Sequence, residues 1–202
     1  ASLHRRITAL AVLMCMCITC VMPALADEYP TQVKTVAEAY VVYDVNSGQV
    51  IMSKDMDTSR APASITKIMT ALLVCENIED FSRTITFTQA ALDEMTETSS
   101  DLTPRAVVGE TMTVENMLYG MFLSSANECA AQLAITVGGS REAFAEMMNK
   151  RAAEIGCSGT HFANAHGLDN ANHYTTPHDM ALIFAEALKN EKFYKMATTV
   201  DY

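Results

Sequence analysis

Alternating hydrophobic and polar positions mark the first part of the chain as β structure. Residues 39–45 carry a strand pattern of Tyr, Val and Ala, and residues 49–53 carry a second one after the turn residues Asn46–Gly48. Two such runs joined by a short turn predict a β-hairpin. A further alternating run at residues 84–88 predicts one short strand. The polar, Ser- and Thr-rich stretch 89–112 is predicted to be mainly loop.

Beyond the hairpin, the period of the apolar residues changes to that of a helix. One apolar stripe recurs at helical spacing and is predicted to face a core; it comprises Ile65, Ile68, Met69, Leu72 and Leu73. This pattern predicts a helix that enters after Pro62, has Ser64 in its first turn, and ends near residues 75–77.

Capping residues set the boundaries of the later helices. Thr113 precedes the apolar run 114–123, Ser140 precedes a segment that ends at Gly156, and Thr176 precedes Pro177; Ser and Thr are preferred helix N-caps and Pro is favoured at the first helical position. The predicted helices are 114–123, 128–137, the segment between Ser140 and Gly156, and 177–188, with a loop over 157–175. No element is predicted for residues 191–202.

The N-terminus has the pattern of an export signal. Arg5 and Arg6 precede the apolar run 7–21, and Ala24-Leu25-Ala26 supplies small residues at the two positions that a signal peptidase reads. This arrangement predicts a secretory signal peptide over residues 1–26, with cleavage before Asp27. An uncleaved membrane anchor is the alternative. The remaining chain, 27–202, has the length of one domain with a hydrophobic core, and we expect it to act outside the cytoplasm, in the cell envelope.

The composition argues against several classes of function. The formal net charge is −10, which argues against nucleic-acid binding, and the acidic residues are spread as on a solvated surface. Cys75, Cys129 and Cys157 form neither a disulfide framework nor a zinc pattern and are predicted to pack as small hydrophobic residues. The four histidines between residues 161 and 178 fit no standard zinc spacing, so we predict no metal and no cofactor.

Ser64 and Lys67 are the first candidates for chemistry. They lie three residues apart, which places a hydroxyl and an amine on one helix face. A serine needs a base to become a nucleophile, and burial on an apolar helix lowers the pKa of a lysine toward the range where it can be that base. The alternative interpretation is structural: a serine near the helix start and a lysine whose side chain reaches solvent would show the same spacing.

Ser125 and Asn127 are the second candidates. They occupy a break between two apolar helices, where their side chains can point into a cleft. The alternative is that both residues simply cap the flanking helix ends, since Ser and Asn are good caps.

With these motifs in order, the sequence resembles the low-molecular-mass D-alanyl-D-alanine carboxypeptidases (serine peptidase family S11), which are penicillin-binding proteins. The resemblance extends over residues 38–190; it is carried by Ser64-x-x-Lys67 within residues 61–73, by residues 113–120 leading to Ser125-x-Asn127, and by segments 161–169 and 173–180. It implies an α+β, β-lactamase/transpeptidase-like fold, in which a helical subdomain packs on an antiparallel sheet.

The resemblance also implies roles. Ser64 would attack the bond between two terminal D-Ala residues of a peptidoglycan stem peptide, and Lys67 would take its proton. Ser125 would relay a proton, and Asn127 would hold Lys67 and the substrate, so that Ser125 and Asn127 also bind substrate. β-Lactams would be covalent inhibitors at Ser64.

Two other functions remain as alternatives. A non-catalytic envelope protein that binds peptidoglycan is disfavoured by the four intact motif residues. A serine β-lactamase is disfavoured because Ala126 stands in the second motif and residues 160–163 contain no Glu for deacylation.

The third motif of the family, Lys-Thr-Gly on a strand, is not found in the sequence. We therefore expect the C-terminal strands of the sheet to lie beyond Tyr202 and residues 27–202 alone to be inactive and poorly stable, because two strands are marginal in water. Relatives often carry a C-terminal amphipathic helix, so membrane association through such a segment is also an expectation.

Overall fold

The computed structural model describes residues 34–200 and Tyr202. The predicted signal peptide, residues 1–26, lies outside the described residues. Residues 1–35 and residues 36–202 form separate units, and the description below concerns the second. Within residues 34–200, no helix is long and apolar enough to span a membrane.

The predicted hairpin is confirmed. Strand β1 (Tyr40–Asp44) pairs antiparallel with β2 (Gln49–Lys54), and the register shifts once at Val42/Tyr43. The carboxylate of Asp44 closes the turn by accepting from the Asn46 N–H at 2.9 Å and the Ser47 hydroxyl at 2.7 Å. These bonds satisfy turn groups that the strand ladder leaves unpaired.

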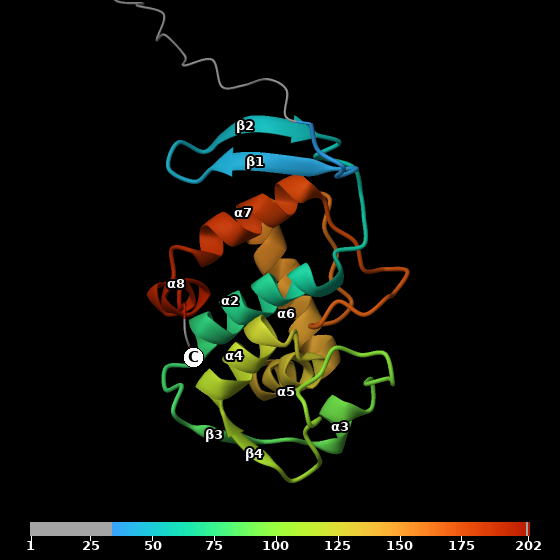
Figure 1. Cartoon of the computed structure of the whole chain (residues 1–202), viewed down its shortest axis with the longest axis vertical. Coiled ribbons are helices and arrows are strands. Elements are labelled where there is room, and N and C mark those ends of the chain that lie inside the picture. Colours follow the sequence, from blue (N-terminus) through green and yellow to red (C-terminus); the bar gives the residue numbers. More distant parts are fainter. Residues whose placement is uncertain (1–33, 201) are drawn as a thin grey trace, which may run out of the picture. The chain divides into compact units, whose positions relative to one another are not determined.

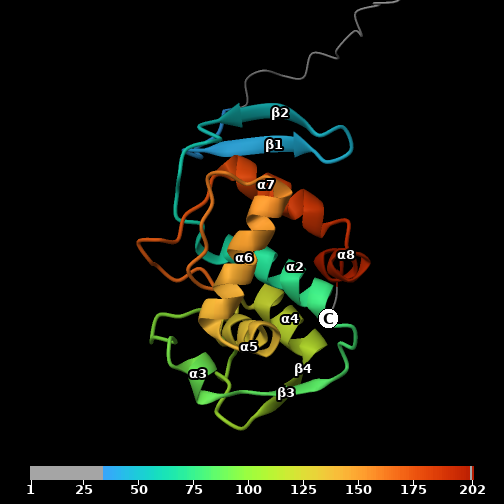
Figure 2. The same cartoon turned by 180° about the vertical axis from the view of Figure 1, so that it is seen from behind.

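Helix α2 lies at the centre of the helical part. It comprises Lys67–Asn77 and follows a short 3₁₀ helix, η1 (Ala63–Thr66). Helices that contact it are α4 (Val114–Leu123), α5 (Asn127–Gly138), α6 (Arg141–Ile155), α7 (Pro177–Ala187) and α8 (Glu191–Ala197). Helix α7 lies between α2 and the hairpin (Figure 1), and α6 crosses in front of α2 in the view of Figure 2, running from α7 toward α5. This arrangement of helices with an antiparallel strand pair is α+β, as predicted.

One continuous core joins these helices. Its largest fully buried side chains include Met69, Leu72, Met117, Leu118, Leu133, Phe144, Met148, Ile183 and Phe193. Burying each such side chain contributes about 1.5–3 kcal/mol. Cys75, Cys129 and Cys157 are free and buried, as predicted. Since α2 contributes Met69 and Leu72, the helix that carries Lys67 is anchored in this core.

The predicted caps are confirmed at three helices. The hydroxyl oxygens of Thr113, Ser140 and Thr176 accept from backbone N–H groups three residues on, at 3.1, 3.1 and 3.0 Å respectively. Helix α6 ends at Gly156, whose φ of 101° is the left-handed conformation that favours glycine.

Three short elements were not predicted. Strand β3 (Thr84–Thr86) is shorter than expected and pairs with β4 (Thr111–Thr113), which lies in the segment predicted as loop. Helix α3 (Gln89–Leu92) is a single turn in the same segment. Helix α8 was also missed; Asn190 caps it, and only Phe193 and Met196 of its residues are buried.

The predicted orientation of Ile65 is wrong. Its side chain is 49% exposed, because η1 has a tighter turn than an α-helix and rotates Ile65 away from the core. It faces an apolar groove of about 430 Å³ between β1 and α7. The groove is lined by Tyr40, Val41, Tyr43, Val45, Ile65, Ile68, Pro177, Met180, Ala181 and Phe184.

Candidate active site

Ser64 is presented on η1, at the mouth of the site. The preceding residue, Ala63, has a φ of 48°, in a region that non-glycine residues seldom occupy. This turn leaves Ser64 exposed, whereas Lys67, one turn further on, is only 4% exposed. The Ser64 Oγ accepts from Lys67 Nζ at 3.2 Å and from the Ser125 hydroxyl at 2.9 Å. The hydroxyl is therefore accessible and already in contact with the Lys67 amine and a second hydroxyl.

Three acceptors surround the buried ammonium of Lys67. Besides Ser64 Oγ, they are the side-chain oxygen of Asn127 and the backbone carbonyl of His166, both at 2.7 Å from Nζ. An ammonium has three N–H donors, so each finds one partner. Burial lowers the pKa of Lys67 to about 8, while the negative charges of Asp101 and Glu128 oppose this shift. A lysine with this pKa is partly deprotonated near neutral pH.

Ser125 and Asn127 come from the junction of α4 and α5. Ser125 has a φ of 54°, a second strained residue in the site. The sequence placed Asn127 in the break between the helices, but the structure makes it the first residue of α5. Its side chain points to Lys67. Its backbone N–H donates to the Ser100 carbonyl at 2.8 Å. Neither side chain makes the capping bond that was the alternative.

Two buried acids lie behind Asn127. Glu128 is fully buried and accepts from the Leu102 N–H at 2.8 Å, while Asp101 pairs with Arg105. Burial raises the pKa of Glu128 above its ordinary value. These contacts tie the segment between α3 and β4 to the start of α5, beside the Asn127 acceptor.

The loop between α6 and α7 closes the site, and the sequence did not predict this role. Within the loop, His166 and His173 are 3% and 4% exposed, and both contact α2 or η1. The Thr70 hydroxyl of α2 donates to the Ala165 carbonyl at 2.6 Å. The loop is therefore bonded to Thr66, Lys67 and Thr70, which lie on one side of the helix that carries Lys67.

His173 has a defined tautomer. The Ala163 N–H donates to Nδ1 at 3.0 Å, so the ring proton is on Nε2, which bonds to Thr66 Oγ1 at 2.7 Å. Burial lowers the pKa of His173 to about 4, with the neighbouring His166 and His161 acting in the same direction. The neutral His173 ring therefore connects Ala163 of the loop to Thr66, which lies two residues after Ser64. The only feature of the sequence that pointed to His173 was the cluster of histidines.

No group of three metal-ligating side chains is close enough to hold an ion in the part of the chain that the structure describes. The buried thiols do not offer an alternative nucleophile, because burial raises the pKa of Cys75 and of Cys157 to about 12.

Comparison with known proteins defines the class first. The structure superposes on penicillin binding protein 6B from Escherichia coli with a TM-score of 0.78 at 26% identity, covering 86% of this chain and 56% of that one. It also superposes on the D-alanyl-D-alanine carboxypeptidase DacD from Francisella tularensis with a TM-score of 0.76 at 34% identity, covering 83% of this chain and 40% of that one. The fold is that of the penicillin-binding proteins, as predicted.

The sequence then gives the family. The family model for D-alanyl-D-alanine carboxypeptidases matches residues 26–202, and the chain belongs to this family. It is 36% identical over 170 residues to the D-alanyl-D-alanine carboxypeptidase DacF of Bacillus subtilis, covering 82% of this chain and 42% of the relative. It is 31% identical over 189 residues to DacA of Escherichia coli, covering 86% and 46%. The chain thus spans less than half the length of these two relatives.

Proposed function

We propose that this chain is part of an exported serine-type D-Ala-D-Ala carboxypeptidase that removes the terminal D-alanine from peptidoglycan stem peptides. The observation that supports it best is the contact of Ser64 Oγ with both Lys67 Nζ and Ser125 Oγ, at 3.2 and 2.9 Å. Residues 1–26 would direct export, and residues 27–202 would form the first part of the enzyme domain, acting in the cell envelope.

In the first step, Lys67 acts as the base. When its amine is neutral, two N–H groups donate to Asn127 and to the His166 carbonyl, and the lone pair faces Ser64. Ser64 Oγ gives its proton to Lys67 and bonds to the carbonyl carbon between the two D-Ala residues. The backbone N–H of Ser64 donates to the developing oxyanion, and one such donor is worth about 3–4 kcal/mol.

The peptide C–N bond then breaks. The leaving amine of D-Ala takes a proton relayed from Lys67 by Ser125, and the shortened peptide remains as an ester on Ser64. Water attacks the ester, the peptide leaves with a free carboxyl group, and Ser64 regains its proton. Asn127 has two tasks in this sequence, since it holds Lys67 and binds the substrate amide. A β-lactam acylates the same oxygen when its ring opens.

The test is acylation of the full-length gene product by a fluorescent penicillin, together with release of D-alanine from a pentapeptide ending in D-Ala-D-Ala. We expect a covalent adduct on the tryptic peptide that contains Ser64, slow release of the penicillin, and D-alanine turnover, all lost in Ser64→Ala. Residues 27–202 alone are expected to give no turnover.

Each alternative has its own outcome. A folded protein that forms no adduct and releases no D-alanine would favour a peptidoglycan-binding role. Rapid penicillin hydrolysis would favour a β-lactamase.

A further inference from the structure

One of the groups that hold Lys67 is a backbone peptide group in a loop. One acceptor of Lys67 Nζ, Asn127, is a side chain on a helix, but the other is the backbone carbonyl of His166 in the loop between α6 and α7. A loop carbonyl can move unless its residue is fixed by other contacts. The backbone here is held in part by Thr70, which donates to the Ala165 carbonyl at 2.6 Å, and by Asn164, whose side-chain oxygen accepts from the His166 N–H at 3.2 Å. The His166 ring adds two further contacts.

Both nitrogens of the His166 ring are bonded. The Leu168 N–H lies 3.2 Å from Nδ1, so Nδ1 is the acceptor and the proton is on Nε2. Nε2 then donates to the Glu94 carboxylate at 3.1 Å. The ring side chain is 2% exposed, so water does not compete effectively for these bonds.

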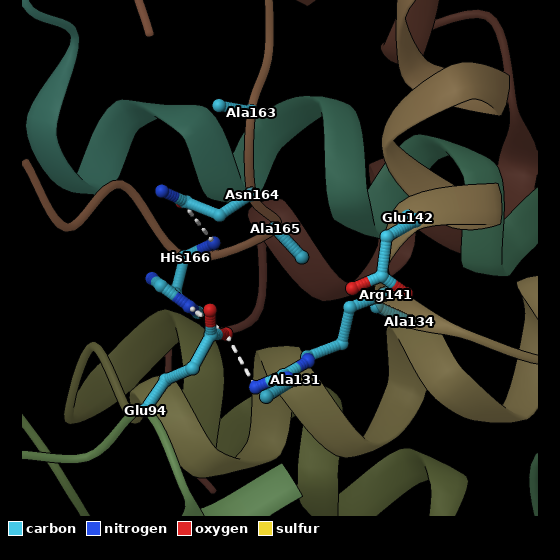
Figure 3. A pocket seen from close by; sticks show the side chains of 9 residues that line it. All are labelled: Glu94, Ala131, Ala134, Arg141, Glu142, Ala163, Asn164, Ala165 and His166. Atoms are coloured by element: carbon cyan, nitrogen blue, oxygen red, sulfur yellow. Dashed lines mark hydrogen bonds and ion pairs between the residues drawn. The ribbon is translucent and has the colours of Figure 1, made fainter. Parts of the chain in front are cut away.

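Glu94 is itself anchored between two elements. It follows α3, and its carboxylate lies between the His166 ring and the guanidinium of Arg141 at the start of α6, which is 3.4 Å away (Figure 3). These groups line a cavity of about 60 Å³. The hydrogen bond from His166 is the largest of the effects that lower the pKa of Glu94, so this group is a carboxylate at neutral pH.

We propose that Glu94 is a positioning residue for Lys67, because it holds the His166 ring and thereby fixes the carbonyl that accepts one Lys67 proton. The inference rests on the proposed function. A neutral amine has two N–H groups and one lone pair, so two fixed acceptors leave the lone pair directed at Ser64. If the His166 carbonyl moves, the amine can rotate and the site opens to water.

The consequence is a change in pH dependence. The charged groups that act on Lys67 are Asp101 and Glu128, and Arg141 lies beyond Glu94. Burial is the main reason that the pKa of Lys67 is about 8 rather than 10.5. Water entry would raise this pKa, and a rise of about one unit reduces the neutral amine about tenfold near pH 7 but hardly at all near pH 10.

The experiment compares Glu94→Ala, Glu94→Gln and Glu94→Asp with wild type in the full-length protein. The acylation rate with a fluorescent penicillin is measured from about pH 6 to 10, and the Lys67 titration is followed by ¹³C NMR of Cε, assigned with Lys67→Arg. Gln keeps an acceptor within reach of Nε2, whereas Asp keeps the charge but is too short. The matched control is Asp93→Ala, since Asp93 is exposed and its carboxylate accepts from the neighbouring Gln89 side chain at 2.8 Å.

We expect Glu94→Ala and Glu94→Asp to acylate about tenfold more slowly than wild type near pH 7, with rates that converge near pH 10 and a Lys67 midpoint raised by about one unit. Glu94→Gln should stay within about threefold, and Asp93→Ala should match wild type. An unchanged Lys67 midpoint in both Ala and Asp variants overturns the proposal, whether the rate is unaffected or falls equally at every pH.

The two readouts separate this proposal from the proposed function. If wild type is not acylated but Glu94→Ala and Glu94→Asp still raise the Lys67 midpoint, the carboxypeptidase assignment fails and the positioning role stands. If wild type is acylated and the midpoint does not move, the reverse holds.

Discussion

Replacing Gly167 by Ala is expected to disable the site through a backbone collision. Gly167 has a φ of 93°, and a Cβ added there would lie 1.9 Å from the Ala63 carbonyl oxygen and 3.0 Å from the Ser64 nitrogen. Both are backbone atoms, so no side-chain rotation relieves the contact. The loop or the Ala63–Ser64 turn must therefore move by about 1.5 Å, because an ordinary non-bonded contact begins near 3.4 Å.

The structure offers a control that separates strain from collision. Gly109 has nearly the same φ, 91°, but an added Cβ there meets nothing within 4 Å. Gly109→Ala should cost about 1 kcal/mol of unfolding free energy, which is the strain of a left-handed residue alone. Gly167→Ala should cost about 2–4 kcal/mol, because a forced shift in a packed region adds about 1–3 kcal/mol.

The effect on chemistry should be larger than the effect on stability. A shift of the Ala63–Ser64 turn alters the contact of Lys67 Nζ with Ser64 Oγ, and a shift of the loop alters its contact with the His166 carbonyl. These distances are 3.2 and 2.7 Å in the structure. A misplacement of about 1 Å costs on the order of 10²-fold in rate. Urea unfolding and the acylation rate with a fluorescent penicillin measure the two effects. Equal losses of stability and rate in the two variants would refute the reasoning.

Two further predictions concern stability. The pKa of His173 is about 4 in the folded state, below its ordinary value of 6.5, so the unfolded state binds a proton first as the pH falls. The contribution of the neutral ring to the free energy of unfolding is therefore intact above pH 6.5 and falls by about 3 kcal/mol as the pH drops to 4. Urea unfolding should therefore show the stability of wild type relative to His173→Gln falling by about 3 kcal/mol between pH 7 and pH 4, and a difference that stays constant with pH would contradict this. Met69→Ala, at a fully buried position of α2, should lower the unfolding free energy by about 2–5 kcal/mol. The control Leu123→Ala, whose side chain is 68% exposed, should change it by less than about 1 kcal/mol.

Local signals in the sequence predicted most of the fold. The bounds of α4 and α6 followed from Thr113, Ser140 and Gly156, because capping bonds join residues close in sequence. Strand β4 was missed because three residues carry too little pattern, and its strand character comes from pairing with β3, about 27 residues away. Helix α8 was missed because its Phe193 and Met196 become an apolar face only when packed against the rest of the core.

In the candidate site, too, contacts between residues close in sequence could be predicted and contacts between distant residues could not. Ser64 and Lys67 could be paired from the sequence because three residues on a helix are neighbours in space. The contacts of Lys67 with Asn127 and with the His166 carbonyl span 60 and 99 residues, and no spacing rule connects such distant positions. A backbone carbonyl is present at every residue, so residue type does not reveal which one binds Lys67. The histidine cluster was therefore considered as a metal site and not as a segment that lines the active site. Gly167 carried the usable signal, since a glycine beside His166 allows the loop backbone to approach Ala63 closely enough to bring that carbonyl to Lys67.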